Sequence, residues 1–176
     1  LTQATNAYVK DGQAIRFGLG AYGTRGGGLP ASLPDAVDDL AKRMHETAGD
    51  NPSGKHGDYG GDAIAWRPFG DRRAGQLVLI AQGTISQADW QTKEIPRKWQ
   101  DGRGRVIKLV AYPVPAVGFV ESMSLYSTTF WNGVNFNSIP FDRLRIVSLL
   151  TDDEIEAGLL EGMKIWTTWA REHLPT

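Results

Sequence analysis

The chain has 176 residues, a length that favours one compact domain with its own buried core. Its 19 basic and 20 acidic residues give a formal net charge of -1, which argues against binding to nucleic acid or a membrane through a strong overall field. The sequence contains no cysteine, which excludes disulfides, thiolate catalysis and cysteine-ligated zinc.

No stretch of the sequence resembles a membrane span or a signal peptide. Apolar runs stay well below the roughly 18 uninterrupted residues that a spanning helix needs. We therefore expect a soluble, cytoplasmic protein with no membrane partner. The first residue is Leu1 rather than methionine, so the expectation of a single domain over residues 1–176 leaves open a further domain upstream.

The N-terminal part of the chain predicts a loop followed by a helix. The first 31 residues are rich in glycine and predict a loop, with a short strand at residues 14–17. Ser32 and Asp35 then have the spacing of a capping box, and apolar residues follow at helical intervals from residue 37 to residue 44. We expect Gly49 to end this helix.

The middle of the chain predicts a sheet. Two short apolar runs, residues 63–66 and 77–81, predict strands joined by the turn-forming segment PFGDRRAG. The second run, LVLIA, is typical of a central strand covered on both faces. A short helix is predicted near Asp89, and a further strand at residues 106–112 is expected to end at the prolines of PVPAVG. The expected fold is α/β, with a mixed central sheet flanked by helices.

The C-terminal part predicts one strand or helix-leading segment, at residues 143–150, and then the clearest helix of the chain. Thr151 and Glu154 have the spacing of a capping box at its start. An apolar stripe follows from Ile155 to Ala170. The pattern predicts a helix over residues 151–173 with one buried face.

Several familiar motifs are weak in this sequence. The segment GLGAYG matches GxGxxG, but the next predicted helix begins about ten residues later, so we expect an ordinary loop rather than a dinucleotide site. The sequence therefore does not favour a small-molecule enzyme whose pocket is lined by this loop. The three histidines do not have the spacing of metal ligands, and no GxSxG segment is present.

Asp62 and Gln82 stand out because each is tied to the end of a predicted strand. If the two strands pair antiparallel, the start of the first and the end of the second lie at the same edge of the sheet, and the side chains meet. Their oxygens suit Mg²⁺, which takes one or two carboxylates together with waters and phosphate oxygens. The alternative is structural, because Asp often caps a turn and Gln often satisfies backbone groups at a strand end.

Four short motifs follow one another along the chain: GDAIAW with Asp62 and Trp66, IAQGT with Gln82, DWQTK with Trp90 and Lys93, and FDRLR at residues 141–145. In this order they resemble the PD-(D/E)xK, or restriction-endonuclease-like, nuclease superfamily, in a branch of bacterial proteins linked to phage defence or restriction. The resemblance covers roughly residues 34–112. Its element order is helix, loop, strand headed by Asp, strand ending in an acid or amide, helix, strand.

This resemblance implies a Mg²⁺- or Mn²⁺-dependent endodeoxyribonuclease that acts on DNA, with RNA as the open alternative. Asp62 would be the metal carboxylate, and Gln82 would occupy the position of the second acid and share the metal. The usual lysine position falls on Thr84, so Lys93 is the candidate for a displaced catalytic lysine. An acid on the first helix often completes such sites, and Asp38 is our choice for it.

Basic residues near these motifs are the expected nucleic-acid contacts: Arg72, Arg73, Arg97 and Lys98. Arg143 and Arg145, in the strand or helix-leading segment predicted at residues 143–150, are expected to face either phosphate or solvent. A second possibility stays open, in which Gln82 and Thr84 mark a decayed metal site. The domain would then bind nucleic acid or a partner protein without cutting. A homodimer and a partner protein of a defence system also stay open.

Overall fold

The computed structural model describes residues 1–19, 24–50, 59–85, 99, 106–120 and 138–161. The helices among them are α1 (Thr2–Val9), the 3-10 turn η1 (Gly26–Gly28), α2 (Leu33–Arg43) and α5 (Arg143–Leu149). The strands are β1 (Gln13–Arg16), β2 (Thr47–Ala48), β3 (Ala63–Arg67), β4 (Leu77–Thr84), β5 (Ile107–Lys108), β6 (Val114–Phe119) and β7 (Ile139–Phe141). A further helical segment covers residues 152–161.

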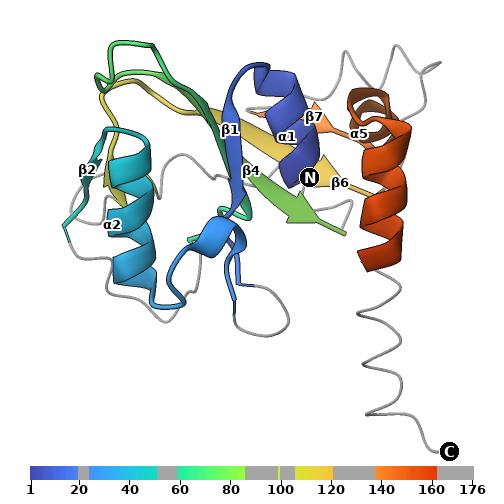
Figure 1. Ribbon diagram of the computed structural model, residues 1–176, viewed down its shortest axis with the longest axis horizontal. Helices are drawn as coiled ribbons and strands as arrows, with labels where there is room; N and C mark the ends of the chain where they lie inside the picture. Colours follow the sequence, from blue (N-terminus) through green and yellow to red (C-terminus); the bar gives the residue numbers. More distant parts are fainter. Residues whose placement is uncertain (20–23, 51–58, 86–98, 100–105, 121–137, 162–176) are drawn as a thin grey trace, which may run out of the picture.

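A mixed five-stranded sheet of order β1-β3-β4-β6-β7 forms the centre of the fold, as Figure 1 shows. β1, β3 and β4 are antiparallel neighbours, whereas β6 is parallel to β4 and β7 is parallel to β6. β2 and β5 pair separately in a small antiparallel sheet. The predicted α/β fold with a mixed central sheet is therefore confirmed.

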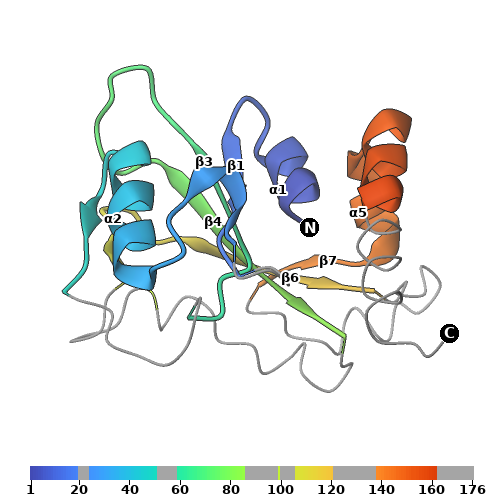
Figure 2. The same ribbon diagram turned by 60° about the horizontal axis from the view of Figure 1, so that its bottom comes forward.

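Different helices cover the two faces of this sheet (Figure 2). Ile64, Trp66 and Ile80 pack with α2 in one hydrophobic cluster. The intervening residues, such as Ala65 and Leu79, pack with α1 and α5 in a second cluster. Residues 78–81 of β4 are all buried, as expected for a strand covered on both faces.

α2 forms where the sequence predicts it, but its ends differ from the prediction. Its buried residues recur at helical spacing and face the sheet, and Pro34 lies in the first turn, where its missing N–H has no helical partner. In the described structure, Ser32 is the N-cap residue without a capping hydrogen bond from its side chain. The helix ends at Arg43 rather than at Gly49, because His45 adopts a left-handed backbone (φ 53°) and β2 begins at Thr47.

α1 stands where the sequence predicted a loop. Its sequence, TQATNAYV, has few apolar residues and no clear stripe. Ala4 and Val9 are nevertheless buried, and the helix packs on β1 and β3. Tertiary packing therefore stabilises this helix more than its own periodicity does. The strand predicted at residues 14–17 is confirmed as β1.

The largest difference from the sequence prediction lies at residues 106–119. The strand predicted at residues 106–112 is reduced to the two residues of β5, and the PVPAVG segment that was expected to end it forms β6. Pairing of β6 with β7 begins at Ala116, after Pro115. Pro115, which has no N–H to donate, thus lies just before the start of the β6–β7 register.

The FDRLR segment forms a junction between a strand and a helix. Phe141 is buried at the end of β7, and the carboxylate of Asp142 caps α5 by accepting a hydrogen bond from the backbone N–H of Arg145 at 2.8 Å. The Arg145 guanidinium donates to the carbonyl of Pro140 at 2.8 Å. Arg143 and Arg145 therefore lie in the first turn of a helix. Of the two alternatives predicted for residues 143–150, the strand was wrong.

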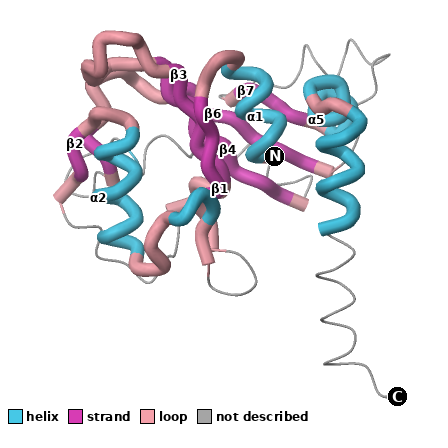
Figure 3. The backbone as a smooth tube through the Cα atoms, viewed as in Figure 1, coloured by secondary structure: helices cyan, strands magenta, loops and turns pink. Residues whose placement is uncertain are grey.

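Residues 152–161 are helical, as the tube of Figure 3 shows. This segment begins with the predicted capping box. The Thr151 N–H donates to Glu154 Oε2 at 2.9 Å, and the Glu154 N–H donates to Thr151 Oγ1 at 3.3 Å. The predicted buried face is not seen in this part of the helix, because Leu159 is 63% exposed. The remainder of the predicted stripe lies outside the described residues. In the described ranges, no helix has the length and apolar character that crossing a membrane requires.

Candidate functional site

Asp62 and Gln82 lie next to each other at one end of the β3–β4 hairpin. The two strands pair antiparallel, with Ala63 opposite Ala81. Asp62 immediately precedes Ala63, and Gln82 immediately follows Ala81, so both belong to the same end of the hairpin. Both residues are partly buried. The predicted pairing of these two strand ends is therefore confirmed; below, the pair is called the Asp62–Gln82 site.

Hydrogen bonds to two strands hold Asp62 in place. Its N–H donates to the carbonyl of Ala81 at 2.9 Å, and its carbonyl accepts from the N–H groups of Phe17 and Gly18 at 2.9 and 3.2 Å. Its side-chain Oδ2 accepts a hydrogen bond from the N–H of Gly83 at 2.7 Å. The position of the carboxylate is thus set by the sheet itself, and a short bond of this kind is typical of a charged acceptor.

The two glycines before Asp62 are needed for different reasons. Gly60 has a φ of 79°, and a Cβ placed there would lie 3.5 Å from both Nε2 and Oε1 of Gln82. A Cβ on Gly61 would come within 2.8 Å of the Trp99 ring, which is buried and packs edge-on against Phe17. Gly61 therefore lets a buried indole approach the strand that carries the carboxylate, whereas Gly60 is required by its left-handed backbone.

The Asp62–Gln82 site lies at the carboxyl ends of two parallel strands. In the register of β4 and β6, Gly83 is opposite Gly118 and Thr84 is opposite Phe119. In open α/β sheets, ligands bind beyond the carboxyl ends of the strands. The position of the pair in the sheet is thus one where ligand binding is common.

The other predicted catalytic residues are not seen to join this pair. Asp38 lies on the exposed side of α2, while the opposite side of that helix packs on the sheet. Lys93 lies outside the described residues, so its role and that of Asp38 stay predictions. Thr84, at the usual lysine position, ends β4. Within the described ranges there is no group of three or more His, Cys, Asp or Glu side chains suited to holding a metal ion.

The basic residues predicted to flank the site are in part far from it. Arg72 and Arg73 lie in the loop that joins β3 to β4, at the opposite end of the hairpin from Asp62 (Figure 1). The five residues of β3, at about 3.3 Å each, separate the two ends by roughly 15 Å. Arg72 and Arg73 therefore do not flank the pair, and their contact with nucleic acid stays a prediction. Arg97 and Lys98 lie outside the described residues.

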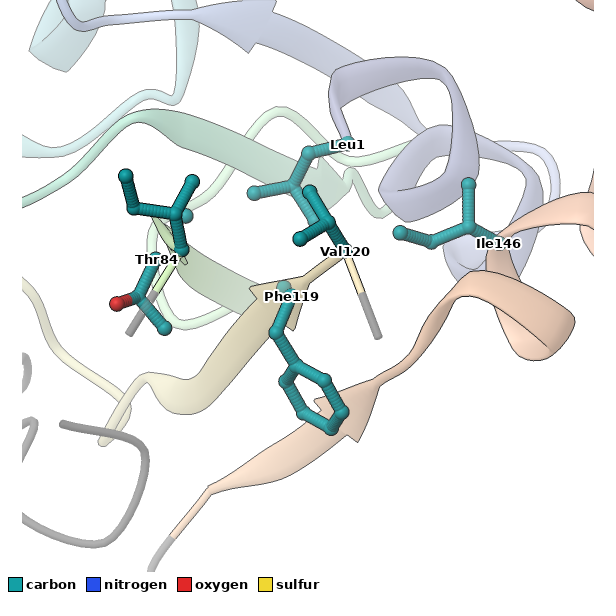
Figure 4. A pocket seen from close by; sticks show the side chains of 8 residues that line it. Leu1, Thr84, Phe119, Val120 and Ile146 are labelled. Atoms are coloured by element: carbon teal, nitrogen blue, oxygen red, sulfur yellow. The ribbon is translucent and has the colours of Figure 1, made fainter. Parts of the chain in front are cut away.

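A pocket of about 510 Å³ adjoins the pair and was not predicted from the sequence (Figure 4). Its lining comprises Leu1, Gly83, Thr84, Ile85, Gly118, Phe119, Val120 and Ile146, and we call it the strand-end pocket. Gly83 and Gly118 become neighbours only through the pairing of β4 with β6. A local sequence pattern therefore could not predict the pocket.

The chemistry of the site follows from its donor atoms. The Asp62 carboxylate is able to offer a charged oxygen and the Gln82 amide a neutral one, and oxygen donors of these kinds suit a divalent cation completed by water and phosphate oxygens. The Gln82 amide is neutral, whereas the PD-(D/E)xK resemblance implies a second carboxylate at this position. Comparisons of the chain with protein-family models, with curated proteins and with solved structures found no match.

Proposed function

We propose that this protein is a Mg²⁺- or Mn²⁺-dependent nuclease that hydrolyses phosphodiester bonds of DNA. The observation that supports the proposal is the antiparallel pairing of β3 with β4, in which Asp62 directly precedes and Gln82 directly follows the paired residues Ala63 and Ala81. The order of α2, the Asp-headed β3, β4 and a later strand also agrees with the order in the PD-(D/E)xK resemblance, with β6 in place of the strand expected at residues 106–112. A role in bacterial phage defence rests on that resemblance alone.

Asp62 and Gln82 are the residues that would hold the metal ion. The Gly83 N–H donates a hydrogen bond of 2.7 Å to Asp62 Oδ2 and so orients the carboxylate while leaving its charge in place. Hydrogen bonds of this kind commonly orient carboxylates that bind metal ions. Mg²⁺, when bound, would lower the pKa of a water molecule and offset charge on the phosphate.

The two side chains have different tasks in this mechanism. Asp62 contributes the negative charge that attracts the cation, while Gln82 contributes a neutral oxygen and an NH₂ group that is able to donate to a phosphate oxygen. Stabilisation of the developing negative charge is the task proposed for Lys93.

The proposed activity is tested by incubating the full chain with supercoiled plasmid and following conversion to nicked and linear forms on a gel. We expect cleavage with Mg²⁺ or Mn²⁺ and none when EDTA removes the metal, because the phosphodiester is activated through the cation. Two results for a folded protein would contradict the proposal. One is cleavage in the presence of EDTA, and the other is the absence of cleavage with both Mg²⁺ and Mn²⁺.

Replacing Gln82 by Glu should lower the Mg²⁺ concentration needed for half-maximal cleavage, by roughly a factor of ten. The added carboxylate lies beside Asp62 at the end of the hairpin, and ligand charge is a main determinant of affinity for hard cations. The measurement is a Mg²⁺ titration of plasmid cleavage. Gln76→Glu is not a suitable control, because Gln76 is buried. Gln13→Glu, on the edge strand β1, is the matched exposed control. An unchanged or higher Mg²⁺ requirement for Gln82→Glu would argue against Gln82 as a ligand.

The second candidate function is a module that binds nucleic acid or a partner protein without cutting. It is favoured by Gln82 and Thr84, which stand where the resembled superfamily has an acid and a lysine. This candidate predicts retarded plasmid or oligonucleotide in a gel-shift assay, with no cleavage under any metal. The plasmid experiment therefore separates the two functions.

A further inference from the structure

The strand-end pocket has the size and position of a ligand site. Its volume of about 510 Å³ falls within the roughly 300–1,000 Å³ typical of small-molecule pockets. Gly83 and Gly118 are direct partners in the register of β4 and β6, and the Leu1 side chain packs over Gly118, where a Cβ would lie 2.6 Å from Leu1 Cδ1. In the view of Figure 4, Leu1 and Val120 lie close together, Ile146 of α5 lies to one side of them, and the Phe119 ring extends away from them. The pocket is thus a property of how α1, α5 and the two strands meet.

The lining selects a neutral and largely apolar ligand. None of the eight lining residues has a charged side chain, and the Thr84 hydroxyl is the single polar side-chain group among them. A charged group placed there would lose its hydration without gaining an ionic partner from a side chain. Phosphate itself is therefore a poor occupant of the pocket.

Gly83 connects the pocket to the Asp62 carboxylate. Its N–H donates to Asp62 Oδ2 at 2.7 Å, while a Cβ on Gly83 would lie 3.6 Å from that oxygen and 4.0 Å from Leu1 Cδ2. Gly83 thus lies within van der Waals distance of both the Asp62 carboxylate and Leu1 of the pocket lining. A group joined to a phosphate at Asp62 through one sugar is well placed to enter the pocket.

We propose that the strand-end pocket binds an unpaired nucleobase of the strand whose phosphate lies at Asp62. A nucleobase is neutral, has two apolar faces and carries hydrogen-bonding groups at its edge, which matches the lining. A paired base would first have to leave the duplex, at a cost of a few kcal/mol, whereas an unpaired base enters without that penalty. The preferred substrate is therefore a nucleic acid with an unpaired nucleotide at the cleavage point. This inference rests on the proposed function.

The test compares two fluorescent DNA duplexes that differ in one nucleotide. Both contain a single unpaired nucleotide at the centre, which carries its base in one duplex and is abasic in the other. Binding is measured by anisotropy with Ca²⁺ in place of Mg²⁺. We expect the duplex with the base to bind about tenfold more tightly, a modest factor for burying one apolar group.

Ile146→Trp tests whether the pocket is the source of this preference. Ile146 lines the pocket from α5, so a larger ring there should fill it and bring the affinity ratio close to one. Val147→Trp is the matched control, because Val147 is the next residue of α5, is 48% exposed and is absent from the pocket lining. Should Ile146→Trp fail to fold, as judged by circular dichroism, Ile146→Phe makes the same test with a smaller ring.

The outcomes separate this proposal from the nuclease proposal. Equal affinity of the wild type for both duplexes, or an unchanged ratio in the Ile146 variant, overturns the nucleobase pocket. Metal-dependent plasmid cleavage together with equal affinity leaves the nuclease standing and rejects the pocket as a base site. A tenfold preference that the Ile146 variant loses, without plasmid cleavage, supports the pocket and rejects the nuclease in favour of a binding module.

Discussion

Replacing Asp62 by Ala should reduce metal-dependent plasmid cleavage by roughly 1,000-fold, equivalent to about 4 kcal/mol of transition-state stabilisation. Asp62 is the one carboxylate of the Asp62–Gln82 site, so its removal leaves a neutral amide as the ligand on this hairpin. A neutral amide is a weak partner for a hard dication. The measurement is the initial rate of plasmid nicking at saturating Mg²⁺, for variant and wild type at equal concentration.

Asp62→Asn separates the charge of this residue from its structural role. The Asn side-chain oxygen is able to accept the hydrogen bond from the Gly83 N–H that Asp62 Oδ2 accepts at 2.7 Å, whereas Ala loses that acceptor. Loss of one such hydrogen bond costs about 1 kcal/mol of stability. We expect Asp62→Asn to fold like the wild type and to lose cleavage like Asp62→Ala.

Asp71→Ala is the matched control for both Asp62 variants. Asp71 is an exposed carboxylate in the β3–β4 loop, at the far end of the same hairpin, where it accepts a hydrogen bond from the Arg73 N–H at 3.0 Å. This variant should cleave at the wild-type rate. Retained cleavage by Asp62→Asn would show that the charge of Asp62 is not needed, and the metal assignment would then be wrong.

Replacing Phe141 by Ala should lower the free energy of unfolding by about 3–5 kcal/mol, the range found for large aromatic residues in protein cores. Phe141 is 1% exposed and belongs to the cluster between the sheet and helices α1 and α5. Its ring meets that of Tyr8 edge-on, with 5.3 Å between the ring centres. The cavity left by the ring would lie where β7 and α1 meet, so the loss combines burial and aromatic packing.

This prediction is measured by urea denaturation followed by tryptophan fluorescence. Val147→Ala, on the exposed side of α5, is the control and should change stability by less than about 0.5 kcal/mol. A loss below about 1 kcal/mol for Phe141→Ala would contradict the assignment of Phe141 to the core. The expected result makes the FDRLR segment structural, because Phe141 packs and Asp142 caps α5.

The sequence by itself determined those features that depend on neighbours close in the chain. The β3–β4 hairpin follows from two apolar runs around a turn-forming segment, and its antiparallel pairing places Asp62 beside Gln82. The capping box of Thr151 and Glu154 is likewise read from a three-residue spacing, and α2 from its helical periodicity. In each case the interacting groups lie on one element or on two adjacent ones.

Only the tertiary structure decided the features that bring distant segments together. α1 is helical because it packs on β1 and β3, and the register of β6 with β7 begins only after Pro115. The hairpin carries Arg72 away from Asp62 although the two are close in sequence. The lining of the strand-end pocket comes from segments far apart in the sequence, namely Leu1, the ends of β4 and β6, and Ile146 of α5. Such pairings depend on long-range burial and register, which local patterns do not encode.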